Sequence, residues 1–194
     1  MSSSRVLSSN QEVFLNFLNT HLGMAALLMP WKKLVDTPTD TTKHTVQHLI
    51  TLFDMLHQDP AKWMIGPGQL DDTLEGKVHV LLGMTASLLF VLIVGFAASL
   101  FYPRETVYRF GVDLVGLIMG AVTLILAITF QPDFDKHWKH FSTNGNGGPV
   151  YLLADHERDY KQMFLVVGVL AGQITLSLGL VADKMKEVLE KLRF

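Results

Sequence analysis

Three apolar stretches of this chain are each long enough to cross a lipid bilayer, which takes about 20 predominantly apolar residues. They run from Val78 to Tyr102, from Phe110 to Phe130 and from Gln162 to Ala182, and the one Asp, Glu, Lys or Arg among them is Asp113. Because hydrocarbon offers no partner to backbone polar groups, such stretches span the membrane as helices. The sequence therefore predicts an all-α integral membrane bundle that forms a single domain over residues 1–194.

A weaker fourth candidate covers residues 11–30. It is apolar overall but contains Asn16, Asn19 and His21. Its alternatives are an amphipathic helix lying in the interface and a secretory signal peptide. We disfavour a signal peptide because one Arg precedes the segment and no small-residue cleavage site follows it. On its length we expect this segment to be a fourth span.

The distribution of basic residues also favours four spans. Residues 1–10, 103–109 and 183–194 then share one side of the membrane and carry seven Lys or Arg, against nine in the much longer segments 31–77 and 132–161 of the other side. The positive-inside rule places the side with the higher density of basic residues, and with it both termini, in the cytosol. Three spans would put Arg104 and Arg109 opposite the basic tail.

Two segments outside these spans are expected to be amphipathic helices. Residues 41–58 carry apolar side chains at helical spacing, between a turn signal and the breaker Asp59-Pro60. The tail 183–194 continues the last span, with Met185, Val188, Leu189 and Leu192 on one face and charged residues largely around the rest. We expect this tail to lie along the cytosolic surface or to contact a partner helix.

Several classes of function are excluded by composition and by missing motifs. A chain without cysteine has no disulfide, thiolate metal site or cysteine nucleophile, and a net charge of −2 does not suit a nucleic-acid binder. No nucleophile elbow, phosphate loop, dinucleotide fingerprint or zinc-protease motif occurs. We therefore expect no enzyme, no catalytic residue and no cofactor. Spans without a pair of acids and without Arg also argue against a coupled ion transporter.

Paired histidines raise the alternative of a metal site. His44 and His48 are four residues apart, and His137 and His140 are three apart with two acids just before them. Both spacings suit chelation from one helix face. The pairs fall in polar loops and lack the clustering of a membrane metal enzyme, so we expect solvated residues and no metal.

Asp113 is an acid inside an apolar run, where an ionisable group is a functional candidate by default. Arg109 lies one helical turn before it, and side chains four residues apart share a helix face. The sequence predicts an intramembrane ion pair between Arg109 and Asp113 near the interface.

Two glycine pairs have the spacing that lets membrane helices approach closely, Gly116 with Gly120 and Gly168 with Gly172. Gln173 follows the second pair and could hydrogen-bond across such a contact. These residues serve either helix packing inside the protein or contact with a client protein. We expect the first pair to be internal and the second to lie nearer a client.

The order of short motifs along the chain resembles that of one family. The motifs are His21-Leu22-Gly23 running to Met29-Pro30, Gln58-Asp59-Pro60, Val78-His79, Phe101-Tyr102-Pro103 leading into Phe110-Gly111, and Ala171-Gly172-Gln173 before a Lys/Glu-rich tail. In this layout the chain is similar to the endoplasmic-reticulum packaging chaperones of fungal amino-acid permeases.

The resemblance implies a four-span protein of the endoplasmic-reticulum membrane. Such a protein shields transmembrane helices of polytopic permeases and assists their folding and exit, with no catalytic residues. Two alternatives stay open. One is an accessory subunit of a large membrane complex, such as a respiratory or ATP synthase complex of the mitochondrial inner membrane, and the other is a small membrane enzyme or metal protein.

Overall fold

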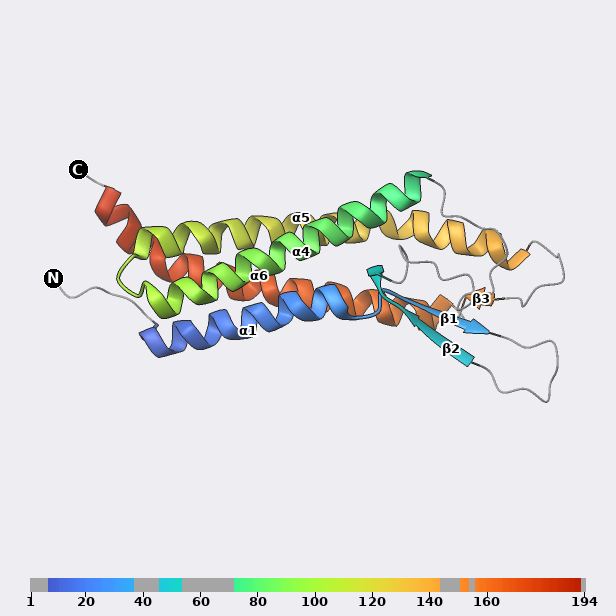
Figure 1. The fold of residues 1–194 in the computed structure, drawn as a ribbon, viewed down its shortest axis with the longest axis horizontal. Helices are drawn as coiled ribbons and strands as arrows, with labels where there is room; N and C mark the ends of the chain where they lie inside the picture. Colours follow the sequence, from blue (N-terminus) through green and yellow to red (C-terminus); the bar gives the residue numbers. More distant parts are fainter. Residues whose placement is uncertain (1–6, 37–45, 54–71, 144–150, 154–155, 193–194) are drawn as a thin grey trace. The chain divides into compact units, whose positions relative to one another are not determined.

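The computed structural model describes residues 7–36, 46–53, 72–143, 151–153 and 156–192. The elements in chain order are α1 Ser9–Leu28, β1 Lys32–Asp36, β2 Val46–Ile50, α4 Asp72–Phe101, α5 Thr106–Thr143, β3 Tyr151–Leu153 and α6 His156–Leu192 (Figure 1).

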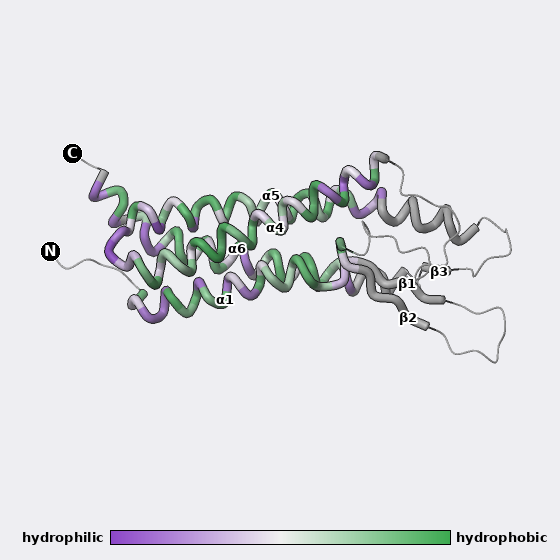
Figure 2. Tube along the Cα trace, viewed as in Figure 1, coloured by the Kyte–Doolittle hydropathy of each residue, from purple (hydrophilic) through white to green (hydrophobic). Residues whose placement is uncertain are grey.

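Three of the helices are long and apolar enough to cross a membrane. The qualifying segments are Thr73–Phe101 in α4, Thr106–Asp133 in α5 and Gln162–Lys191 in α6. Figure 2 shows hydrophobic residues predominating along these segments. The three strongest predicted spans and the predicted class, a helical membrane bundle, are confirmed, and the structure adds three short strands to the helices.

The chain divides into two compact units. The first, here called the terminal unit, consists of residues 1–27, 84–125 and 168–194. The second, here called the loop unit, consists of residues 28–83 and 126–167. In the terminal unit α1 packs with segments of α4, α5 and α6 (Figure 1). Its buried apolar side chains are Ala26, Leu88, Leu92, Ala98, Leu170, Leu180, Val181 and Val188.

The loop unit contains a small antiparallel sheet in the order β2-β1-β3. Lys32 pairs with Ile50 in β1 and β2, and Leu34 pairs with Leu153 in β1 and β3. The sheet corrects the prediction of an amphipathic helix over residues 41–58. Residues 46–50 form strand β2, and most of the rest of that range lies outside the described residues. Pairing with β1, the strand that precedes it, outweighs the local helical spacing, which carries no information about such a partner.

The helices of the loop unit extend further than the predicted spans. α5 continues from Phe130 through Pro132 to Thr143, and α6 begins at His156. Lys77 near the start of α4 forms an ion pair with Asp133 of α5 and lies 5.5 Å from the centre of the Phe130 ring. In the loop unit, α4 and α5 are therefore joined by a partly exposed ion pair and by a contact between a cation and an aromatic ring.

The tail predicted at residues 183–194 is part of α6, which is continuous to Leu192. Lys184 is 1% exposed and Val188 is 4% exposed, so the first turns of the tail pack into the terminal unit. The tail continues the last span as a helix, as predicted, but its first turns are buried in the bundle and do not lie along a surface. The reason is chemical: Lys184 finds two carboxylates inside the bundle.

Candidate functional site: a buried ion cluster and polar core

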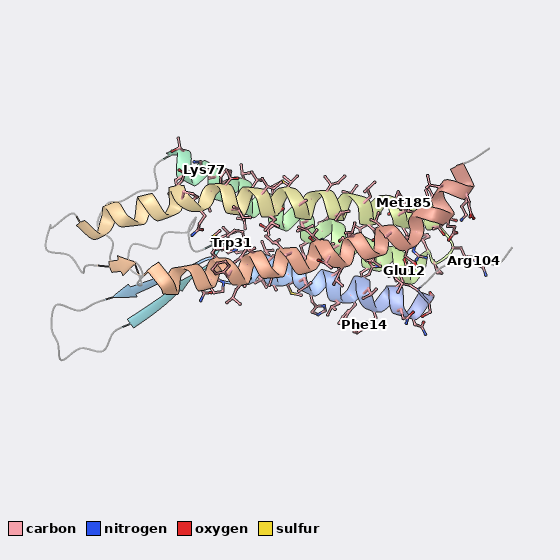
Figure 3. The ribbon with its side chains drawn as sticks, turned by 180° about the vertical axis from the view of Figure 1, so that it is seen from behind. Glu12, Phe14, Trp31, Lys77, Arg104 and Met185 are labelled. Carbon is pink, nitrogen blue, oxygen red and sulfur yellow. The ribbon has the colours of Figure 1, made fainter. Side chains whose placement is uncertain are left out.

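Helix α1 has three polar residues inside the bundle and most of its largest apolar residues outside, with His21 as an exposed polar residue among them. Figure 3 shows Glu12 between the helices and Phe14 on the outer side of α1. Glu12, Asn16 and Asn19 are each at most 3% exposed, whereas Phe14 is 60% exposed. A helix surrounded by water shows the opposite pattern. This arrangement suits a helix whose outer face meets lipid.

Four charged side chains from three helices meet in the terminal unit, and we call them the ion cluster. They are Glu12 of α1, Arg109 and Asp113 of α5, and Lys184 of α6, and none is more than 7% exposed. Arg109 pairs with Glu12. Lys184 pairs with Glu12 at 2.6 Å and also with Asp113. Two acids and two bases make the cluster formally neutral.

The ion cluster is tied to the turn between α4 and α5 and is flanked by further polar contacts of α6. Arg109 donates a hydrogen bond to the carbonyl of Pro103. Asp183 accepts one from the backbone N–H of Leu7 at 3.1 Å, and Glu187 accepts one from the Thr106 hydroxyl at 2.7 Å. This stretch of α6 therefore fastens the segment before α1 and the start of α5 to one end of the bundle.

A second cluster of polar side chains, centred on Ser177, lies on the same faces of α1 and α6. The Ser177 hydroxyl oxygen accepts hydrogen bonds from the side-chain amides of Asn19 and Gln173, both at 2.9 Å. Gln173 also donates to the carbonyl of Gly116 at 3.4 Å. Within the described residues, the side-chain carbonyl oxygens of Asn19 and Gln173 have no hydrogen-bond partner. Because partners are scarce in a hydrocarbon surrounding, the bonds that do form join α1, α5 and α6.

The structure changes the prediction made for Arg109 and Asp113. Both are buried on α5 as expected, but each forms its ion pair with another helix, Arg109 with Glu12 and Asp113 with Lys184. The argument against a coupled ion transporter assumed that the spans hold no pair of acids and no Arg. This assumption is wrong, because Glu12, Asp113 and Arg109 are buried in the bundle. A neutral cluster whose charges are mutually paired nevertheless has the character of a structural contact more than of an ion pathway.

Sequence reasoning missed Glu12, Asn16, Asn19, Ser177 and Lys184. A signal for the α1 residues was present, because Glu12, Asn16, Asn19 and Gly23 recur at steps of four, three and four in an otherwise apolar segment. This spacing marks one helix face. For Lys184 the sequence gives no comparable sign, since it opens a run of charged residues that reads as a solvated tail.

The predicted glycines lie in different surroundings. A Cβ on Gly120 would overlap the Gln173 amide, and a Cβ on Gly116 would lie 3.3 Å from Leu92 of α4. A Cβ on Gly172 would lie 3.5 Å from Leu22 of α1, while one on Gly168 would meet nothing within 4 Å. Gly116, Gly120 and Gly172 are thus interior contacts, and Gly168 faces outward.

Gly168 belongs to a line of small exposed residues along α6, which we call the small-residue stripe. Its members are Gly168, Ala171, Thr175, Gly179 and Ala182, and all five are exposed. Their steps of three, four, four and three residues keep them on one helix face. A Cβ on Gly179, like one on Gly168, would meet nothing within 4 Å.

The side chains of the histidine pairs, at residues 44, 48, 137 and 140, lie outside what the structure describes. Among the side chains that it does describe, no group of three or more His, Cys, Asp or Glu could hold a metal ion. His48 lies in β2 and His137 and His140 lie in α5, while His44 is outside the described residues.

Comparison of the chain with models of protein families, with curated proteins and with solved structures found no match.

Proposed function

We propose that this protein is a membrane chaperone that binds transmembrane helices of polytopic membrane proteins while they fold. The observation that carries the proposal is the small-residue stripe. It is an open helix face with the composition that membrane helices use for close contact, on a bundle whose polar side chains are largely paired internally. The resemblance in motif order adds the client class, amino-acid permeases, and the membrane, that of the endoplasmic reticulum.

The physical basis is the cost of unpaired polar groups in hydrocarbon. An unfinished polytopic protein exposes such groups to lipid, at about 1–3 kcal/mol or more for each. A client helix can approach closely over Gly168 and Gly179, where no side chain separates the two backbones. Close approach gains dispersion contacts and shields the client from other unfolded chains. Gln173, fully buried on the opposite side of α6, is assigned to internal packing instead.

The proposed topology has four spans with both termini in the cytosol. Its support is the outward apolar face of α1 together with the basic segments on the terminal side. Arg109 and Lys184 belong to the ion cluster and are not available to the loops. The same short segments still hold five other Lys or Arg, which is a higher density than that of the nine in the long segments of the other side.

The test is a pair of variants matched in chemistry. Gly168→Leu with Gly179→Leu fills the small-residue stripe. Gly83→Leu with Gly111→Leu adds the same bulk at two other glycines with open space, on α4 and α5. The readout is the fraction of a newly made amino-acid permease that is aggregated in the endoplasmic reticulum, with abundance of the protein itself as control.

We expect aggregation of the permease only with the stripe variant, at normal abundance of both variant proteins. Equal permease aggregation in the two variants, or none in either, contradicts the proposal. An accessory subunit of a permanent complex gives a different result. The protein would then co-purify with a mature complex at fixed stoichiometry, and the stripe variant would be depleted from that complex.

A further inference from the structure

Helix α1 differs from the other three long helices in how it can enter the membrane. α4, α5 and α6 each contain a segment that is apolar enough to span by composition, and α1 does not reach that level. Glu12, Asn16 and Asn19 lower its hydropathy, and all three are buried in the terminal unit. α1 by itself therefore carries a carboxylate and two amides to which lipid offers no partner, although the Asn16 amide donates within α1 to the carbonyl of Glu12.

The interhelical partners of these polar groups all come from later parts of the chain. Glu12 pairs with Arg109 and Lys184, and Asn19 donates to Ser177. Thr20 donates to the carbonyl of Leu92 at 3.2 Å. Lys184 lies near the opposite end of the sequence from Glu12, so it is synthesised long after α1.

We infer that α1 becomes a membrane span only when α5 and α6 supply Arg109 and Lys184 to Glu12. This dependence is independent of the client proteins and goes beyond the proposed function. Pairing with two cations offsets part of the cost of placing the Glu12 carboxylate between helices. In addition, α5 and α6 hold two cations and only one acid, Asp113, in this cluster, so the acid of α1 is the group that makes the cluster neutral.

The absence of cysteine from the chain makes a direct test practical. One single-cysteine variant, Ser4→Cys, places the label before α1, and another, Thr37→Cys, places it after α1. In sealed microsomes a membrane-impermeant maleimide labels only the site on the outer side. If α1 spans, the two sites give opposite results in the otherwise natural chain.

The decisive variant is Arg109→Gln with Lys184→Gln in both single-cysteine backgrounds. We expect α1 to leave the membrane-spanning position, so that the two sites label alike. The matched control is Arg104→Gln with Lys191→Gln. It removes the same two charges from the same end of the bundle, but Arg104 is exposed and Lys191 is 47% exposed. We expect the control to label like the natural chain.

A rescue variant separates lost pairing from general misfolding. Glu12→Leu, Asn16→Leu and Asn19→Leu, added to the chain that lacks Arg109 and Lys184, make α1 apolar enough to insert alone. We expect opposite labelling to return. Opposite labelling in the variant that lacks both cations overturns the inference. So does loss of it in the control, or failure of the rescue, or identical labelling in the natural chain.

Discussion

The side-chain amide of Gln173 on α6 lies directly against the backbone of Gly120 on α5. A Cβ on residue 120 would overlap the amide oxygen and lie 2.9 Å from its carbon. Gln173 is fully buried and is held from its other side by Ser177. Residue 120 must therefore be glycine because a Cβ there would collide with the Gln173 side chain. The absence of a side chain also lets α5 and α6 approach closely.

Gly120→Ala is expected to destabilise the bundle, by about 1–3 kcal/mol, because the Gln173 amide must move from a position where it is hydrogen-bonded. Gly168→Ala is the control, since its Cβ would meet nothing within 4 Å. Thermal unfolding of the purified proteins in one detergent measures the difference. Equal unfolding temperatures for the two variants would contradict the described contact.

Ser177→Ala is expected to cost about 1–2 kcal/mol, because the hydroxyl oxygen that accepts from Asn19 and Gln173 is removed and two buried donors lose a partner. Thr175→Ala is a matched control on the same helix. Its hydroxyl is exposed and donates to the carbonyl of Ala171 within α6. The same unfolding measurement applies, and a loss with Thr175→Ala as large as with Ser177→Ala would show that the polar group does not join the helices.

Charge balance in the ion cluster leads to a prediction about paired substitutions. Lys184→Met leaves two buried acids with one Arg and is expected to cost about 3–5 kcal/mol. Adding Asp113→Asn restores neutrality, because Glu12 keeps its pair with Arg109. The double variant is therefore expected to be more stable than Lys184→Met alone. A double variant no more stable than the single one would mean that the net charge of the ion cluster does not determine the stability of the bundle.

Lys191→Met provides the comparison for that series. Lys191 pairs with Glu187 at 2.9 Å on the surface of α6 and is half-exposed. An exposed pair one helical turn apart contributes about 0.3–0.5 kcal/mol. We expect Lys191→Met to change the unfolding temperature in detergent by little. A destabilisation as large as that of Lys184→Met would show that burial does not make the ion pairs of Lys184 stronger than an exposed pair.

Both termini are expected to face the cytosol. The basis is the excess of basic residues in the segments that the four-span topology places on that side. Tags at either end should be digested by protease added to sealed microsomes, while a lumenal marker protein in the same vesicles stays intact. Protection of one terminus would contradict the four-span topology.

The sequence was sufficient to predict the fold class and the three strongest spans, because a long apolar run indicates a membrane span by its length and composition alone. Predicting α4, α5 and α6 required no knowledge of the segments that pack against them. Strand β2 was different, since its structure depends on pairing with β1, and a helical spacing of apolar residues does not report that partner.

The candidate site could be predicted only in part. Asp113 and Arg109 stood out because they are rare residue types near or within an apolar run, and both are in the ion cluster. Their partners could not be assigned, because an ion pair within one helix and a pair between helices leave the same residues in the sequence. Lys184 could be recognised as a buried group only once α1 and α5 had been placed beside it.

The neutrality of the ion cluster has an electrical consequence. A voltage across a membrane does work on a displaced charge, about 2.3 kcal/mol for each elementary charge moved through about 100 mV. Glu12, Arg109, Asp113 and Lys184 sum to zero, so a joint displacement of the four along the membrane normal couples to the field almost not at all. Although the ion cluster concentrates four charges among the helices, moving it as one body along the membrane normal takes nearly the same energy in a polarised and in a depolarised membrane.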